Sequence, residues 1–339
     1  PRSTLFPYTT LFRSEKMAIT AAMVKELREM TGAGMMDCKK ALNETNGNMD
    51  EAVEFLRKNG QAKAEKKASR IAAEGLCMVV TKDDQTAAVV EVNSETDFVA
   101  KNATFQEFVK AVATQAVNSD AADMDAFMAE KWNEDASKTV SEALVEKVAV
   151  IGENLKIRRF EKVVAEHGCV VPYVHGGGRI GVIVDADTDV VNDTVKEAMH
   201  NIAMQIAALN PKYVSRDEVS ADYIAHEKEI LLAQIMNDPK ESQKPEKVIN
   251  GMIEGRISKE LKEVCLVDQV YVKAEDGKQT VAKYLEEVSK AVGGTVKVKR
   301  FVRFETGEGL EKKQEDRKST RSELQSPRYL VCRLLLEKK

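Results

Sequence analysis

Apolar positions in the first part of the chain recur at the three-to-four-residue spacing of amphipathic α-helices. Residues 20–59 carry three such runs, separated by short segments that contain glycine. Gly60 stands where the third helix is expected to end. The pattern predicts a three-helix head over residues 17–60, followed by a basic, alanine-rich linker at 61–74 that is also expected to be helical.

From residue 75 onward, runs with the two-residue period of β-strands alternate with amphipathic helices. Capping boxes, in which a small polar residue is followed three positions later by Glu, are expected at Asn48, Thr104 and Ser215. Residues 118–136 are polar and are expected to form a loop or an insertion. The expected strands are 76–81, 86–92, 155–164, 169–174, 180–185, 269–273 and 295–305, and the expected helices after the head begin near 104, 138, 191, 221, 245 and 281.

This order of elements predicts an α+β fold with two similar α/β core lobes of antiparallel strands. Lobe 1 is expected at 75–168, and lobe 2 at 169–218 together with 265–305. Residues 219–264 are expected to be inserted into lobe 2 as a protruding antiparallel helical hairpin. A short echo of basic and aromatic residues, at 157–161 and again at 299–305, hints that the two lobes are related.

The two ends of the chain differ in composition from the body. Residues 1–16 contain a near-repeat without a long apolar core, so we expect a non-native leader rather than a signal peptide. The tail, 306–339, is expected to be non-native after about residue 316. The whole chain has a formal net charge of -4; because residues 1–16 carry +2 and residues 311–339 carry +4, the body at 17–310 carries -10.

Composition narrows the class of protein. The acidic body argues against direct binding of nucleic acid, and no apolar run is long enough to span a membrane. The five Cys are widely spaced and the four His are scattered, so neither a zinc site nor a disulfide framework is expected. The cysteines fit a reducing compartment. The residue pattern contains no catalytic triad or paired-carboxylate motif, and we expect neither catalysis nor a cofactor.

Three places in the sequence could carry a function. The glycine run after His175 could cradle a phosphate, but it lies between two expected strands, which favours a hairpin turn. Met35 and Met36 are adjacent on an expected helix, so at least one should be exposed and could contact a protein. Phe98, in Thr96-Asp97-Phe98, could anchor the turn from inside or project as a wedge into a partner.

Several of these segments, in the same order, resemble the bacterial elongation factor Ts family. The matching stretches are MVKELREMTGAGMMDCKKALNETNGNMDEAVEFLRKNG at 23–60, EVNSETDFVAKN at 91–102, IGENLKIRRFE at 151–161, HGGGRIGVIV at 175–184 and RFETGEGLEKK at 303–313. The resemblance covers about residues 17–313 and implies a ubiquitin-associated-like head on a two-lobed core.

The resemblance implies a cytoplasmic guanine-nucleotide exchange factor of elongation factor Tu, which binds that partner in its GDP-bound and nucleotide-free forms. It implies that the partner is contacted by a wedge beside its Mg²⁺ site, by the head, by the second lobe and by a lysine of the linker. The residues so implied are Thr96, Asp97, Phe98 and Val99 in the wedge, Lys25, Arg28, Met35 and Met36 in the head, His175 in lobe 2, and Lys66 or Lys67 near the nucleotide.

Two other functions stay open on the residues alone. One is a small-molecule enzyme that uses the glycine turn, and the other is an adaptor that acts through its ubiquitin-associated-type head. The helical hairpin could also join two copies of the chain as a homodimer.

Overall fold

The computed structural model describes residues 19–275 and 277–311. This part of the chain has a mixed α+β fold with helices at the N-terminus and three antiparallel sheets, so the α+β class is confirmed. The predictions for the leader at 1–16 and for the tail beyond about 316 lie outside the described residues.

The first three helices lie where the sequence pattern predicts helices. Helices α1 (Ala21–Thr31), α2 (Met35–Glu44) and α3 (Met49–Lys67) pack around a small core. The Asn48 side chain caps α3 by accepting from the backbone N–H groups of Asp50 and Glu51. The core side chains with no exposed surface include Leu27, Cys38 and Leu42.

The prediction that Gly60 ends the third helix is wrong. Helix α3 continues through Gly60 to Lys67, into the expected linker. Gly60 is buried against helix α7 (Val140–Ile151), where a Cβ would lie 3.6 Å from that of Ala149. A Cβ would fit there at an ordinary contact distance, so packing against α7 keeps the helix intact and overrides the weak helix propensity of glycine.

The first large sheet has the strand order β1-β2-β5, all antiparallel. Its strands are β1 (Glu74–Thr81), β2 (Thr86–Ser94) and β5 (Lys156–Val164). Helix α5 (Ala103–Asn118) packs on this sheet with α7 beside it. Asn102, rather than Thr104, caps α5, because its Oδ1 accepts from the Thr104 N–H at 2.8 Å.

Residues 118–136, predicted to be a loop or an insertion, do not form an open loop. They contain helix α6 (Met124–Ala129), strand β3 (Lys131–Trp132) and the start of β4 (Asp135–Thr139). Phe127 and Trp132 are buried in the lobe 1 core, and the Trp132 ring lies 5.9 Å from that of Phe108. Two aromatic side chains in an otherwise polar stretch provide enough apolar surface to order it.

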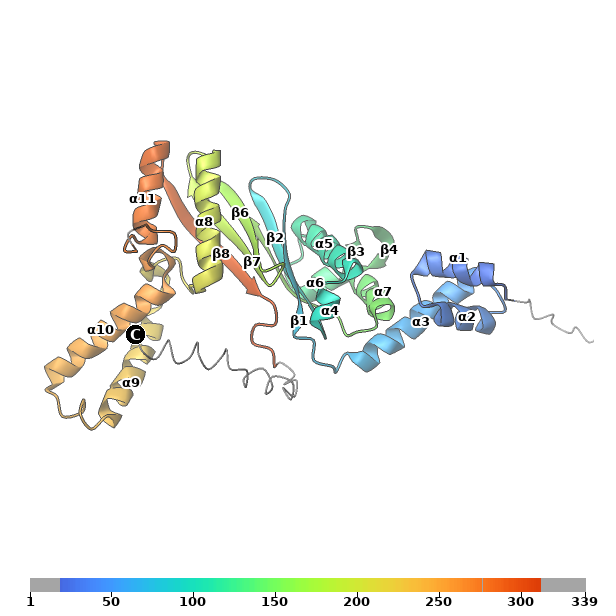
Figure 1. Cartoon of the computed structure of the whole chain (residues 1–339), viewed down its shortest axis with the longest axis horizontal. Coiled ribbons are helices and arrows are strands. Elements are labelled where there is room, and N and C mark those ends of the chain that lie inside the picture. The colour runs from blue at the N-terminus through green and yellow to red at the C-terminus, as the bar shows by residue number, and fades with distance from the viewer. Residues whose placement is uncertain (1–18, 276, 312–339) are drawn as a thin grey trace, which may run out of the picture.

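The second large sheet has the order β6-β7-β8 and is again antiparallel. Its strands are β6 (Cys169–His175), β7 (Ile180–Thr188) and β8 (Val296–Glu305). Helices α8 (Asp193–Leu209) and α11 (Val281–Val292) cover its outer face, as Figure 1 shows.

Two predictions in this half of the chain are wrong. No strand forms at 269–273; the 3₁₀ turn η2 (Leu266–Asp268) leads into an irregular segment. The buried Gln205 side chain donates to the Val270 carbonyl and accepts from the Val272 N–H, so it takes backbone groups that a strand would need. Ser215 caps only the 3₁₀ turn η1 (Arg216–Glu218).

The two large sheets pack face to face, so the core has four layers, helix, sheet, sheet and helix (Figure 1). Strand β2 is buried on both faces because it lies inside this stack. Its alternate residues Ala87 and Val89 face the second sheet, whereas Ala88 and Val90 face the lobe 1 helices.

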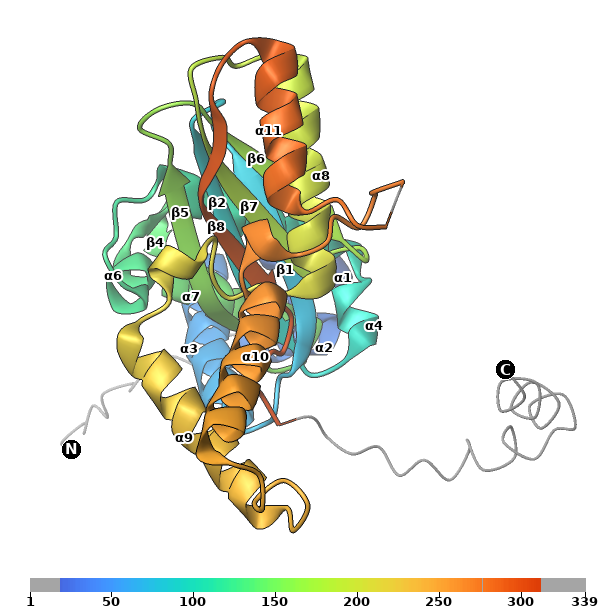
Figure 2. The same ribbon diagram turned by 90° about the vertical axis from the view of Figure 1, so that its left-hand side faces the viewer.

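Helices α9 (Ala221–Asn237) and α10 (Glu246–Val264) form the predicted antiparallel hairpin, which extends away from the sheets in Figure 2. Ser220 caps α9. The buried seam between the two helices includes Ile235, Ile249, Ile253, Ile257 and Leu261.

The two sheets share an irregularity at the same place. Where β2 pairs with β5, Glu91 lies opposite Arg159 and the register then skips Arg158. Where β7 pairs with β8, Asp185 lies opposite Arg300 and the register then skips one residue again. The echoed segments of the sequence therefore occupy matching positions beside a β-bulge.

Candidate partner-binding site

The wedge is built where β2 ends. After Ser94 the chain turns into the four-residue helix α4 (Asp97–Ala100), and the Thr96 side chain accepts from the Val99 N–H to cap it. The Phe98 side chain is 80% exposed, which decides between the two interpretations of this residue: it is not an internal anchor. Val99 instead packs against the lobe 1 core and holds the short helix down.

A pair of carboxylates clasps this turn to the turn between α7 and β5. Glu153 accepts from the backbone N–H groups of Glu95 and Thr96 at 3.1 Å each and from the Thr96 hydroxyl at 2.7 Å. In return, Glu95 accepts from the Asn154 N–H at 2.7 Å. The two turns are therefore tied in both directions, so the exposed ring stands on a fixed base.

Asp97 is exposed beside the ring. Its carboxylate pairs with Lys101 at 2.7 Å, and the same lysine lies 6.0 Å from the Phe98 ring centroid. The hydrogen bond from Lys101 lowers the pKa of Asp97 below its usual value, so the group is an anion at neutral pH. The wedge therefore presents an aromatic ring next to a negative charge.

The head presents two of its predicted contact residues as a sulfur-rich apolar patch. Met35 is 59% and Met36 is 76% exposed at the start of α2, so both methionines point outward rather than one being in the core. Lys25 and Arg28 are exposed one turn apart on α1, and Lys25 lies 3.7 Å from Glu29. Flexible methionine side chains suit an adaptable protein contact.

The two lysines at the end of α3 differ in their surroundings. Lys67 donates to the Gly152 carbonyl at 2.7 Å, next to the clasp. Its burial lowers the pKa of the Lys67 ammonium. Lys66 is exposed to solvent. Lys67 thus helps to hold the base of the wedge, while Lys66 faces outward.

His175 ends β6, and its exposed ring lies 2.9 Å from the Tyr173 hydroxyl. The glycine run after it is the predicted hairpin turn between β6 and β7. A Cβ on Gly178 would lie 2.7 Å from the Leu76 side chain, and the Gly178 carbonyl accepts from the Cys77 N–H. This turn packs against lobe 1, which argues against an open phosphate cradle.

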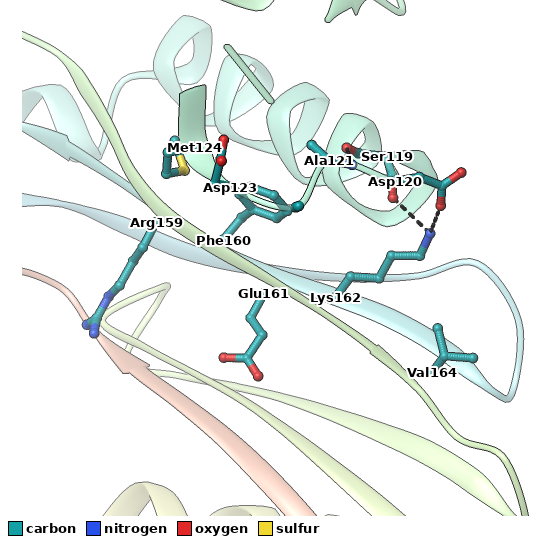
Figure 3. Close-up of a pocket in the computed structure, with 11 residues that line it drawn as sticks. Ser119, Asp120, Ala121, Asp123, Met124, Arg159, Phe160, Glu161, Lys162 and Val164 are labelled. Carbon is teal, nitrogen blue, oxygen red and sulfur yellow. Dashed lines mark hydrogen bonds and ion pairs between the residues drawn. The ribbon is translucent and has the colours of Figure 1, made fainter. Parts of the chain in front are cut away.

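Two hollows lie elsewhere on the surface. A groove of about 500 Å³ separates the head from α7. A second, of about 570 Å³, follows β5, where Lys162 bonds to the Ser119 carbonyl and to Asp120 (Figure 3). None of the predicted site residues lines either hollow. Across residues 19–275 and 277–311, no cluster of acidic, His and Cys side chains could hold a metal ion, and no helix is long and apolar enough to cross a membrane.

The predicted residues thus fall into four places: the wedge, the head, the end of α3 with Lys66 and Lys67, and the His175 turn. The structure joins Lys67 to the wedge through Gly152 and the clasp. Sequence reasoning missed Glu153 and Asn154 as the other half of the clasp. Their signal was available, because a polar pair directly follows the glycine that caps α7.

An exposed aromatic ring on a hydrogen-bonded base, with exposed methionines and cations on the head, has the features of a protein-binding factor. Comparison with known proteins identifies the family: the profile named Elongation factor TS matches residues 95–308. The elongation factor Ts of Clostridioides difficile (strain 630) is 53% identical over 299 residues, which is 88% of this chain and 96% of that protein. The elongation factors Ts of Clostridium novyi (strain NT) and Clostridium perfringens (strain 13 / Type A) are each 50% identical over the same shares. The chain belongs to the elongation factor Ts family, the non-enzymatic nucleotide exchange factors of elongation factor Tu.

Proposed function

We propose that this chain releases GDP from elongation factor Tu by inserting Phe98 and Asp97 beside the partner's Mg²⁺ site. The exposed Phe98 ring on its clasped base is the observation that carries the proposal. Thr96 and Val99 orient the ring, the first by capping α4 and the second by packing on lobe 1.

The mechanism needs differential binding and no covalent step. A GTPase holds GDP through its phosphate-binding loop and Mg²⁺. A factor that binds the nucleotide-free form more tightly than the GDP form weakens GDP binding by the same factor. A ring that enters beside the metal site, with a carboxylate that competes for polar contacts there, fits only the open form.

The other exposed regions extend the interface. Met35 and Met36, with Lys25 and Arg28, provide a head contact for the nucleotide-binding domain of the partner, and His175 reaches a second part of it. Lys66 lies near the bound nucleotide of the partner, and Lys67 supports the wedge through its hydrogen bond to the Gly152 carbonyl. The head acts as a ubiquitin-associated-like module, and the two lobes, with their matching bulges, are related units that carry an inserted hairpin. The factor works in the cytoplasm, without direct contact to nucleic acid or membrane.

The test is the release of fluorescent GDP from elongation factor Tu in stopped flow. We expect small amounts of this chain to accelerate release, and Phe98→Ala to remove most of the acceleration. Unchanged release with the unaltered chain would refute exchange activity. Full acceleration by Phe98→Ala would refute the role of Phe98 as a wedge but not the exchange activity of the chain.

We also propose that the hairpin joins two copies of the chain. Leu232, Met236 and Val248 are 43–56% exposed on its helices, so apolar surface stays open to solvent in the described part of the chain. Sedimentation should show a dimer that Leu232→Glu dissociates, while Glu229→Gln, an exposed position on the same helix, leaves it intact. A monomer at all accessible concentrations would exclude this arrangement.

A further inference from the structure

A charged group lies buried between the two sheets. The Glu91 side chain, on the face of β2 that meets the second sheet, has no exposed surface. A buried carboxylate is costly unless hydrogen bonds satisfy it. The Glu91 oxygens accept from Arg158, Arg159, the Asn93 amide and the backbone N–H of Gly307, at distances between 2.6 and 3.2 Å.

The bulge in β5 makes this arrangement possible. Consecutive residues of a regular strand point to opposite faces. Because the register skips Arg158, both Arg158 and Arg159 reach the same carboxylate. The matching acid in the second sheet, Asp185, lacks this set of donors: its Oδ1 is buried and has no hydrogen-bond partner among residues 19–275 and 277–311. The fully bonded site is therefore specific to the first sheet.

The Gly307 donor comes from the other lobe. The segment Thr306–Glu308 follows β8 and crosses to lobe 1, where Arg158 donates to the Glu308 carbonyl at 2.6 Å and Arg159 to its carboxylate at 3.0 Å. Gly307 has φ +73°, and a Cβ there would lie 2.1 Å from the carbonyl oxygen of Ala73, which is adjacent to β1. No other residue fits this crossing without moving the backbone.

The same segment holds the His175 turn. The Thr306 N–H donates to the Arg179 carbonyl at 2.9 Å, and the Thr306 hydroxyl lies within 3.3 Å of the carbonyl oxygens of Gly178 and Arg179. The Cys77 thiol lies 3.5 Å from that hydroxyl. One short segment therefore contacts the buried carboxylate of lobe 1 and the glycine turn of lobe 2. From Glu91, β2 runs on directly into the wedge.

We propose that Glu91, Thr306 and Gly307 are positioning residues that fix the His175 turn relative to the Phe98 wedge, so that both engage elongation factor Tu as one preorganised surface. The proposal rests on the proposed function, in which both regions contact the partner. When two contacts are held in place in advance, binding the second requires little further ordering of the protein.

The test combines variants in pairs. Thr306→Val keeps the side-chain volume but removes the hydroxyl, and should weaken binding to nucleotide-free elongation factor Tu about fivefold, the effect of one hydrogen bond. In this background His175→Ala should lose at least half of its fold effect on the dissociation constant, because the turn is no longer held. Phe98→Ala should keep its full effect, because the clasp of the wedge is untouched.

Control variants separate positioning from loss of stability. Thr306→Ser keeps the hydroxyl and should restore binding. Thr188→Val makes the same chemical change at a buried threonine at the opposite end of β7, where the hydroxyl bonds to the Val190 carbonyl, and should leave both effects unchanged. Hydrogen exchange of the Cys77 amide should be faster in Thr306→Val than in wild type and in Thr188→Val.

The outcomes are distinguishable. If His175→Ala keeps its full effect in the Thr306→Val background, or if Thr188→Val acts in the same way as Thr306→Val, the positioning role is wrong while the proposed function stands. If neither Phe98→Ala nor His175→Ala changes binding in the otherwise unaltered chain, the proposed contacts fail, and the positioning role fails with them.

Discussion

Replacement of Phe98 by alanine should separate binding from folding. Phe98 is 80% exposed, so the folded monomer loses almost no packing, and surface changes of this kind alter the free energy of unfolding by less than about 0.5 kcal/mol. A Phe side chain offers about 200 Å², so insertion of the exposed part into an apolar slot removes roughly 160 Å² from water, worth ~4 kcal/mol at most.

Part of that gain in binding free energy is offset by the entropy cost of ordering the ring and by the cost of opening a slot in the partner. Truncated interface anchors commonly cost ~2–4 kcal/mol, and we expect about 2–3 kcal/mol here, a 30- to 150-fold loss. The assay is the dependence of GDP release from elongation factor Tu on factor concentration, with urea unfolding measured on the same samples.

Phe105→Ala is the matched control. Phe105 lies seven residues further on, on α5, and has no exposed surface, so the same substitution should cost ~3–5 kcal/mol of folding free energy. Exchange by the folded fraction of Phe105→Ala should be close to normal. If Phe98→Ala lowers stability as much as Phe105→Ala does and leaves exchange intact, the ring is a structural anchor and the wedge is refuted.

Three further predictions concern the frame. Gly60→Ala should raise the free energy of unfolding by up to ~1 kcal/mol, because its Cβ meets Ala149 at an ordinary contact distance, whereas Gly60→Leu should cost ~1–3 kcal/mol, as urea unfolding would show. Trp132→Ala should cost ~3–5 kcal/mol by circular dichroism; a change below ~0.5 kcal/mol would restore the polar-loop interpretation. Burial raises the pKa of Glu91, but hydrogen bonds from the Gly307 N–H and Asn93 and the charges of the two arginines outweigh burial and hold the pKa below 4.5. The Glu91 carboxylate therefore stabilises the folded state above pH 4.5, and this contribution is lost as the pH falls through the lowered pKa. Glu91→Gln should cost ~3–5 kcal/mol at pH 7 and flatten that acid dependence; an equally steep acid loss in this variant would contradict the assignment.

Local patterns in the sequence were sufficient wherever one element buries one face. The hairpin helices and α11 follow from helical spacing and flanking breakers, and the first strand pair from alternation around a polar turn. The Thr96-Asp97-Phe98 segment was identified as a functional candidate because an aromatic residue stood alone in a polar turn. The family resemblance favours a projecting Phe98 over an internal anchor, and the exposure of the side chain in the structure agrees with this.

Other features depend on contacts between residues far apart in the chain. Gly60 has the same local signal whether it ends a helix or lies under a neighbouring one, and only its contact with Ala149 decides. Residues 118–136 looked like a loop because their order comes from two aromatic rings that pack on a distant sheet.

The clasp and the buried Glu91 site show where sequence reasoning ends. By itself the sequence determined the order and kind of most helices and strands and the aromatic candidate Phe98, since these depend on short-range spacing. The tertiary structure alone decided that Glu153 closes on the wedge and that Gly307 reaches Glu91 across 216 positions of the chain. Hydrogen bonds of this kind form only when separate elements have been brought together by packing, and no local pattern of residues records which partners will meet.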